Sequence, residues 1–310
     1  MLVSNLTVFS RELWYGTPIL LRTSQVYLTN SRKERKIDLS MYLTYFHLKE
    51  FPFLPSPDSR FLYLSDHVNE TLQKCLYMID NRIGPVYTSG PIGAGKTTLA
   101  DRLQQKLTQE PERYKVTYLL IPPRLTVNSF LRLVMEEFAV KTHNSYVRNL
   151  EYLAAWLREQ HQQGVKPVLI LDEAQYLTPA HLKLLHFLLN YETKREKLLQ
   201  IVLFGQTELS TKIERFPELK SRLYPASLTA LNRADTEGLI AFRWFVAGGG
   251  KTLPFSPAVL DTLFQVTLGL PREIVKVCDL ALISAYTQQH PAVQVEDVHA
   301  AVHELNLRTP

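Results

Sequence analysis

The sequence contains little cysteine and no long apolar run. Its 310 residues include only two cysteines, Cys75 and Cys278, and neither belongs to a zinc-type spacing or a redox pair. Each lies among apolar neighbours in a helix-like stretch, so we expect two buried thiols in a reducing compartment. The longest apolar runs, such as 168–171, have strand length and fall far short of the ~20 residues of a membrane span. Arg11 and Glu12 interrupt the apolar core that a signal peptide requires, so the sequence predicts a cytoplasmic protein without a membrane span.

Positive charge is concentrated near the N-terminus. The formal net charge is +5, and residues 1–40 carry six Lys/Arg and three Asp/Glu, which is +3 of that total. Much of this charge lies in the cluster 31–36. A short charged run is typical of a solvated tail, so the charge is a poor indication of a nucleic-acid partner.

After residue 85, apolar stretches of strand length alternate with helical spacing. The predicted strands are 85–89, 115–121, 167–172 and 199–205. The predicted helices are 66–82, which precedes the first strand, and then 96–106, 127–138, 150–163 and 179–191. Continuous apolar strands separated by helices predict a parallel sheet covered by helices on both faces, a three-layer α/β fold.

The two ends of the chain differ from this α/β pattern. Residues 41–63 are dense in aromatic residues and prolines, which indicates a packed, irregular arm. Beyond residue 231 only helical spacing is found, at 236–246, 256–266, 272–288 and 295–305. We therefore expect an N-terminal extension (1–40), an α/β core with its arm (41–230) and a small helical domain (231–310).

Glycine is scarce, yet three of the 12 glycines fall within residues 90–95. Residues 90–97, Gly-Pro-Ile-Gly-Ala-Gly-Lys-Thr, fit the phosphate-loop pattern G-x-x-x-x-G-K-[ST] between a strand and a helix. Its glycines let successive N–H groups face phosphate oxygens, and the helix start adds its positive dipole. Lys96 is expected on the β and γ phosphates of ATP and the Thr97 hydroxyl on Mg²⁺. The predicted nucleotide-binding residues here are Gly90, Pro91, Ile92, Gly93, Ala94, Gly95, Lys96, Thr97 and Thr98.

Two carboxylates end the apolar strand 167–172. Beside the phosphate loop, Asp172 is placed to hold Mg²⁺ through water and Glu173 to polarise the attacking water. An acidic pair at a strand end is common on its own. About 75 residues after a phosphate loop, it predicts ATP hydrolysis.

Three further polar residues have the positions of γ-phosphate sensors. Gln206 directly follows the strand 199–205 and is placed to sit between Glu173 and the γ-phosphate. Arg222 follows by about one helix and is predicted to reach the ATP of a neighbouring subunit as an arginine finger, with Arg215 and Lys220 as alternatives; any of the three is otherwise a surface charge. Arg272 begins a helix of the C-terminal domain and is expected to contact the nucleotide.

These features together resemble the AAA+ ATPases of the ExeA-like branch. The resemblance covers about residues 41–305 and rests on 41–65, 171–175 (Leu-Asp-Glu-Ala-Gln), 204–209, 269–272 and 278–282. It implies the strand order 5-1-4-3-2, a helical lid, and ATP bound between subunits of a homo-oligomer, either a ring or a filament.

The chain departs from the secretion members of this branch, which continue into a membrane span and a peptidoglycan-binding region. The sequence ends at Pro310 without either. A shorter form resembles the transposition regulators of the TniB, TnsC and MuB kind, which assemble on duplex DNA with ATP and recruit a transposase. We therefore expect a regulator of DNA transposition with non-specific phosphate contacts to duplex DNA. The alternative is a secretion-associated ATPase acting on protein partners, and a phosphotransferase is disfavoured by Glu173, Gln206 and Arg272.

Two departures concern smaller features. Many AAA+ proteins restrain the water-activating glutamate with a polar residue at the end of the second strand, where this chain has Pro122 and Pro123. Residues 1–40 lie outside the resemblance, so either translation begins at Met41 or these residues form an arm that docks on a partner.

Overall fold

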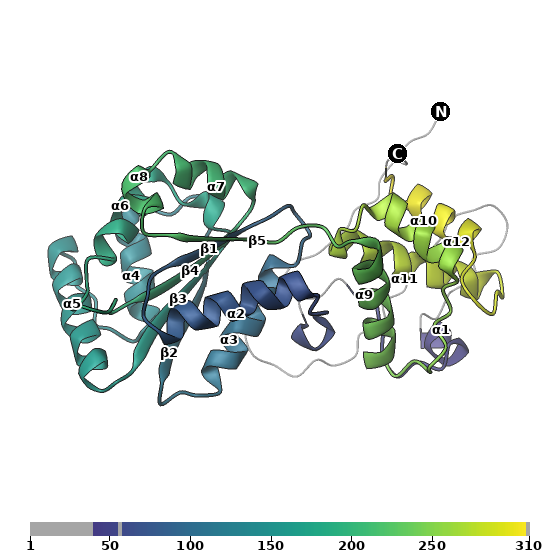
Figure 1. Ribbon diagram of the computed structural model, residues 1–310, viewed down its shortest axis with the longest axis horizontal. Helices are drawn as coiled ribbons and strands as arrows, with labels where there is room; N and C mark the ends of the chain where they lie inside the picture. Colours follow the sequence, from purple (N-terminus) through teal and green to yellow (C-terminus); the bar gives the residue numbers. More distant parts are fainter. Residues whose placement is uncertain (1–39, 55–57, 308–310) are drawn as a thin grey trace.

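The computed structural model describes residues 40–54 and 58–307, and it contains an α/β part beside a bundle of helices (Figure 1). Five strands form one parallel sheet in the order β2-β3-β4-β1-β5. Their bounds are Val86–Ser89 (β1), Tyr114–Leu120 (β2), Lys166–Asp172 (β3), Gln200–Gly205 (β4) and Tyr224–Ser227 (β5). Read from the other edge this is 5-1-4-3-2, so the predicted fold class and strand order are confirmed.

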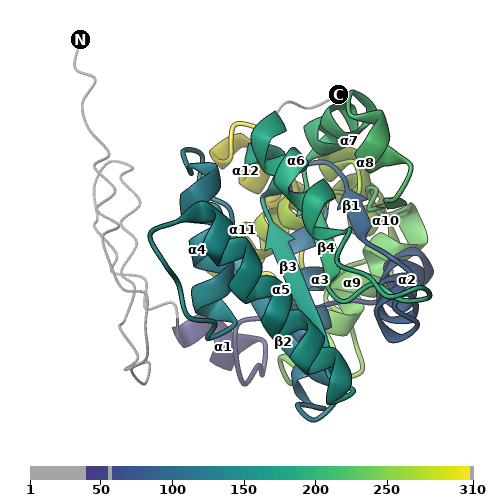
Figure 2. The ribbon, with the colours of Figure 1, turned by 90° about the vertical axis from the view of Figure 1, so that its left-hand side faces the viewer.

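Helices cover both faces of the sheet, as Figure 2 shows from the end of the α/β part. One face packs against α2 (Asp66–Asp80) and α3 (Lys96–Thr108), and the other against α4 to α8. The second group comprises α4 (Val127–Glu137), α5 (Tyr146–Gln162), α6 (Pro179–Leu188), α7 (Thr207–Glu214) and α8 (Pro217–Lys220). Side chains alternate between the faces along β3, where Val168 and Ile170 join the first cluster and Leu169 and Leu171 the second. Because both faces are buried, β3 is a continuous apolar run.

The edge strand β5 was not located by the apolar pattern. Its four residues, Tyr-Pro-Ala-Ser, are mostly exposed, and Pro225 is tolerated because the outer side of an edge strand needs no N–H donor. On that side, the carbonyl of Pro225 accepts a hydrogen bond from the Lys74 ammonium group of α2.

The C-terminal helices form a cluster of their own. They are α9 (Arg233–Val246), α10 (Pro257–Thr267), α11 (Pro271–Thr287) and α12 (Val295–Glu304). The aromatic arm, with α1 (Ser40–Tyr45) and the 3₁₀ turn η1 (Ser59–Phe61), packs here: Tyr42, Phe53 and Phe61 are buried against these helices. The arm was expected to belong with the α/β core (41–230), whereas its buried aromatic residues belong to the helical cluster. Residues 1–39 of the predicted extension lie outside the described part of the chain.

Arg243 fastens the arm to α9. Its guanidinium donates hydrogen bonds to the carbonyls of Phe61 (3.3 Å), Pro52 (3.1 Å) and Leu54 (3.3 Å), and lies 5.2 Å from the Phe61 ring centroid. Burial lowers the pKa of Arg243 to about 10, so the group remains charged near neutrality. One side chain thus satisfies three carbonyls of an irregular segment that has no strand partner.

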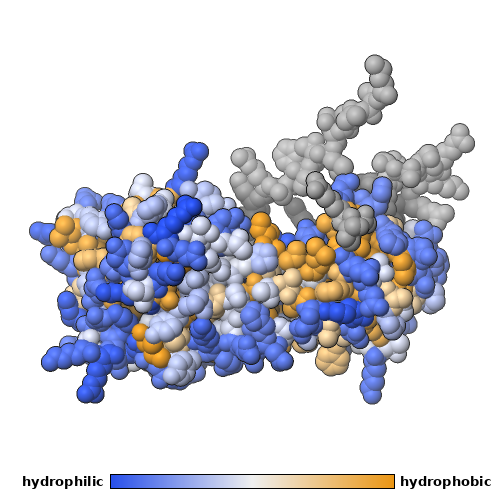
Figure 3. Space-filling model, turned by 45° about the horizontal axis from the view of Figure 1, so that its top comes forward, coloured by the Kyte–Doolittle hydropathy of each residue, from blue (hydrophilic) through white to orange (hydrophobic). Residues whose placement is uncertain are grey.

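The two parts of the molecule differ in the hydropathy of their surfaces. On the face in Figure 3, hydrophobic residues gather over the helical part and beside the hollow next to it, whereas the α/β part is mostly hydrophilic.

Cys75 and Cys278 are buried and unpaired, which confirms the prediction of two buried thiols. Among residues 40–54 and 58–307, no helix has the length and apolarity needed to cross a membrane.

Asp279 on α11 gives the helical part a measurable pH dependence. Burial raises its pKa to about 6, although the Tyr42 hydroxyl donates a 3.2 Å hydrogen bond to it. The folded state therefore holds this proton more tightly than the unfolded state, and stability falls as pH rises from about 4 to about 6. In Asp279→Asn this loss, on the order of 2 kcal/mol, should disappear. Urea unfolding of both proteins between pH 4.5 and 8 measures the free energy of unfolding. The same pH dependence in both proteins would contradict the raised pKa of Asp279.

Candidate functional site

The phosphate-loop sequence lies between β1 and α3. Gly93 (φ +84°) and Gly95 (φ +91°) both have left-handed backbone conformations that side chains disfavour, and Gly95 caps the start of α3. A Cβ at Gly93 would also lie 2.9 Å from the Cβ of Arg272. The glycines therefore allow the loop backbone to turn sharply, and Gly93 also allows Arg272 of the helical part to pack closely against the loop.

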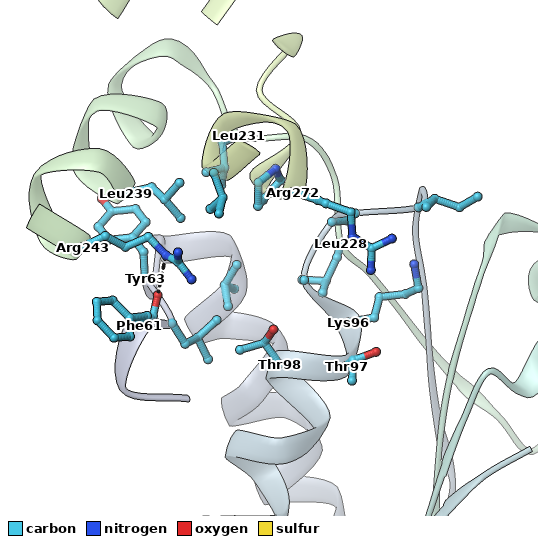
Figure 4. Close-up of a pocket in the computed structure, with 18 of the residues that line it drawn as sticks. Phe61, Tyr63, Lys96, Thr97, Thr98, Leu228, Leu231, Leu239, Arg243 and Arg272 are labelled. Carbon is cyan, nitrogen blue, oxygen red and sulfur yellow. Dashed lines mark hydrogen bonds between the residues drawn. The ribbon is translucent and has the colours of Figure 1, made fainter. Parts of the chain in front are cut away.

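Lys96 and Arg272 bring two positive charges together at this loop. The Lys96 ammonium group is buried and donates hydrogen bonds to the carbonyls of Gly90 (2.9 Å) and Pro91 (2.8 Å). Burial lowers the pKa of Lys96, and the Glu173 carboxylate opposes that shift. Figure 4 shows Arg272 reaching from the start of α11 toward Lys96. Within the described residues neither side chain forms a salt bridge, so the pair is available to an anion.

The helical part is attached to the loop at the residue predicted to contact the nucleotide. The Arg272 backbone N–H donates a 3.2 Å hydrogen bond to the carbonyl of Gly93, and Pro271 occupies the first turn of α11. The start of α11 is therefore joined to the phosphate loop by a backbone hydrogen bond and by close packing at Gly93.

Asp172 joins the loop to β3. Its carboxylate, almost fully buried, accepts 2.8 Å hydrogen bonds from the Thr97 and Tyr118 hydroxyls. Burial and the adjacent Asp172 raise the pKa of Tyr118, so its hydroxyl stays protonated and can donate a hydrogen bond. Burial and Asp172 also raise the pKa of Asp101, to about 6. Tyr118 was not predicted, because nothing in the sequence indicates that its ring on β2 faces β3.

The oxygen donors around Asp172 fit Mg²⁺. This ion is commonly held by one or two protein oxygens together with waters and substrate phosphates. Thr97 and Asp172 supply a hydroxyl and a carboxylate in direct contact with each other. No cluster of three or more His, Cys, Asp or Glu capable of holding a metal occurs among the described residues. The residues present therefore suit an ion that arrives with a nucleotide rather than one resident in a protein cage.

Glu173 and Gln206 follow β3 and β4 and line the same cavity, which has a volume of about 300 Å³. Glu173 has a left-handed backbone (φ +55°), and its N–H donates a 2.8 Å hydrogen bond to the Asp172 carboxylate. Gln206 caps the start of α7. The loop residues from Ile92 to Thr98 and Arg272 line the cavity as well, whereas Gly90, Pro91 and Asp172 are not among the residues that line it.

The far end of this cavity is apolar and comes from distant parts of the chain. Its lining residues are Leu54, Phe61, Leu62, Tyr63, Val68, Leu228, Leu231, Leu239 and Val275, with Arg243. None of these was predicted as a site residue. The only signal was the aromatic density of the arm, and that pattern does not show which rings face a cavity.

Arg222 lies far from the cavity of its own chain. It precedes β5, which pairs with β1 in parallel register from Val86↔Tyr224 onward, so it sits at the opposite end of β1 from the phosphate loop. Its guanidinium donates a 2.6 Å hydrogen bond to the Asn190 side chain, near the surface. Arg215 and Lys220 are exposed at the ends of α7 and α8. A role for any of the three at an ATP site remains a prediction and requires a second subunit.

Comparisons with known proteins agree with this architecture. Residues 79–213 match the AAA domain family. Cdc6p from Pyrobaculum aerophilum superposes with a TM-score of 0.61 at 16% identity, over 80% of this chain and 70% of that one. The Thermotoga maritima RuvB Holliday junction branch migration motor gives 0.53 at 17% identity, over 84% and 75%. The fold is that of the AAA+ proteins. At these identities the AAA+ likeness concerns the fold alone.

A relative at higher sequence identity is general secretion pathway protein A of Aeromonas hydrophila. It is 33% identical over 271 residues, which are 86% of this chain and 49% of that protein. The chain described here thus spans about half the length of this relative. The match supports the ExeA-like part of the resemblance, and none of these comparisons supports the transposition part.

Proposed function

We propose that this AAA+ chain binds MgATP and hydrolyses it to ADP and phosphate. The observation that carries the proposal is the arrangement around one cavity. Lys96 and Arg272 supply positive charge, Thr97 with Asp172 supplies oxygen ligands, and Glu173 supplies an adjacent carboxylate. The AAA domain family consists generally of P-loop ATPases, which agrees with this chemistry.

The two ends of the cavity suit the two ends of ATP. The loop N–H groups, the start of α3 and the two cations favour the triphosphate. The apolar end, where Phe61, Leu62 and Tyr63 of the arm meet Leu231 and Leu239, suits a flat purine ring. Binding therefore requires the α/β part, the arm and the lid together.

Hydrolysis needs an activated water and stabilisation of the transferred phosphoryl group. Glu173 is the group to orient that water and accept its proton. Lys96, Arg272 and the loop N–H groups stabilise the charge on the γ-phosphoryl oxygens, and Gln206 faces the same space. Thr97 and Asp172 would hold a Mg²⁺ ion that arrives with ATP, and the ion would neutralise charge on the phosphates.

Two substitutions separate binding from hydrolysis. Lys96→Ala should weaken ATP binding about a hundredfold, equal to about 2.7 kcal/mol, because it removes the buried charge at the phosphates. Glu173→Gln should bind ATP like the unchanged protein but turn it over at least ~100-fold more slowly. Fluorescent-ATP titration and phosphate release measure the two effects. Glu208→Gln, an exposed carboxylate nearby, is the control; normal turnover by Glu173→Gln would reject the assigned role.

Self-association completes the proposed site. Arg222 cannot act in its own subunit, because it lies at the other end of β1 from the loop. In a ring or filament, a surface arginine of one subunit can supply charge to the γ-phosphate held by the next. We therefore propose a homo-oligomer in which Arg222 acts in trans.

Mixing of inactive variants tests the trans arrangement. Arg222→Ala should bind ATP but lose hydrolysis, and Lys96→Ala should keep Arg222 but lose binding. Mixed oligomers pair an intact ATP site with an intact arginine, so activity should reappear at intermediate ratios. Arg215→Ala and Lys220→Ala are the matched controls and should retain activity. Full activity of Arg222→Ala alone, or no recovery at any ratio, would exclude Arg222 as the finger.

For the wider role, we propose a secretion-associated ATPase that acts on protein partners. The support is the match of 33% identity over 86% of this chain to general secretion pathway protein A. This was the alternative in the sequence analysis, and it is now favoured over the transposition regulator with its duplex DNA and transposase partners. The Aeropyrum pernix ORC1 structure is a complex with DNA, but at 17% identity and a TM-score of 0.59, over 82% of this chain and 69% of that one, it is informative about the fold alone.

Electron microscopy with an ATP analogue distinguishes the two roles. A secretion-associated ATPase should form the same oligomers with and without duplex DNA, and its turnover should not depend on DNA. Glu173→Gln with ATP provides the same trapped state without an analogue. Rings or filaments that appear only on duplex DNA would overturn the secretion proposal and restore the transposition role.

A further inference from the structure

Gln175 is a buried polar residue beside the site to which the hydrolysis scheme assigns no role. It lies in the 3₁₀ turn η2 (Ala174–Tyr176), directly after Asp172 and Glu173, and is only 8% exposed. Both ends of its side-chain amide are used. The NH₂ group donates a hydrogen bond to the Glu173 carboxylate, and the oxygen accepts a 3.0 Å hydrogen bond from the backbone N–H of Gln206.

The backbone of this turn is also fixed. Lys212 of α7 donates hydrogen bonds to the carbonyls of Gln175 and Leu177, the second at 3.1 Å. The turn after β3 and the helix after β4 are therefore joined at two places, once through the Gln175 side chain and once through Lys212. The Gln175 amide is therefore anchored at its oxygen by the backbone of Gln206 and at its own backbone by Lys212.

The chemistry of an amide suits this position. A glutamate that accepts a proton from water must be held in one orientation while remaining ionised and keeping one oxygen free. The Gln175 NH₂ group donates to one oxygen, Oε2, and brings no charge or titratable proton of its own. No hydrogen bond within the described residues involves the other oxygen, Oε1, and Glu173 is one of the residues that line the cavity.

We propose that Gln175 is a positioning residue, whose amide aims the Glu173 carboxylate into the cavity and links its orientation to the Gln206 backbone. The inference rests on the proposed ATP hydrolysis. It also accounts for Pro122 and Pro123, which follow β2 and offer no side-chain donor to Glu173. Among the described residues, Gln175 is the side chain that hydrogen-bonds this carboxylate.

Two variants of Gln175 test the proposal through turnover, affinity and pH dependence. Gln175→Ala should lower kcat ten- to a hundredfold while KM for ATP and the affinity for an ATP analogue stay within about twofold. Gln175→Glu keeps the length and can still accept from the Gln206 N–H, but it places a second carboxylate against Glu173. Two adjacent carboxylates keep a proton between them, so the acid limb of the kcat profile should move up by at least one pH unit.

Gln200→Ala is the matched control. Gln200 is also a buried glutamine, but it lies at the amino end of β4, where its amide donates to the carbonyl of Lys197. Its loss should change the urea midpoint and leave kcat and its pH profile unchanged. Circular dichroism and analogue binding show that each variant is folded.

The outcomes separate this inference from the proposed function. Unchanged kcat in Gln175→Ala with an unchanged pH profile in Gln175→Glu would overturn the positioning role. A rise in basal turnover in Gln175→Ala would also overturn it, because the amide would then hold Glu173 back. If the unchanged protein shows no ATP hydrolysis above Glu173→Gln, the proposed function itself fails.

Discussion

Parallel pairing of β1, β3 and β4 is the constraint on which the site depends. In a parallel sheet all carboxyl ends meet at one edge, so residues far apart in sequence come together there. The phosphate loop follows β1, the Asp172–Glu173 pair ends β3, and Gln206 follows β4. Their arrangement follows from the sheet register, because each of these segments lies at or directly after the carboxyl end of its strand.

The remaining walls of the site are supplied by irregular structure. Arg243 holds three carbonyls of the arm, and the backbone of Arg272 is bonded to the loop at Gly93. These hydrogen bonds pair backbone polar groups that have no partner within a strand or a helix, and they thereby order the segments that carry them. The apolar end of the cavity exists only because the arm is held between the sheet and the lid.

The sequence predicted the parts of this site that are local. The phosphate loop, the acidic pair and the start of α11 are short patterns whose geometry is determined within a few residues. Tyr118 and Phe61 were not predicted, because their roles depend on which face of a strand or turn meets a distant segment. Gln175 was noted only as the last residue of the family-like motif 171–175, without a role. Its hydrogen bonds to two different strand ends become visible only once the register is known.

The division of the arm between two hydrophobic clusters has a thermodynamic consequence. Leu62 packs with the cluster between the sheet and helices α2 and α3, whereas its neighbours Phe61 and Tyr63 pack with the helical cluster. A rotation between the two parts must therefore pull adjacent residues of one wall in different directions. A ligand bound against that wall favours one relative orientation of the parts, and by reciprocity that orientation favours the ligand by the same free energy. Release of such a ligand and a rotation between the two parts would then be two descriptions of a single coupled equilibrium.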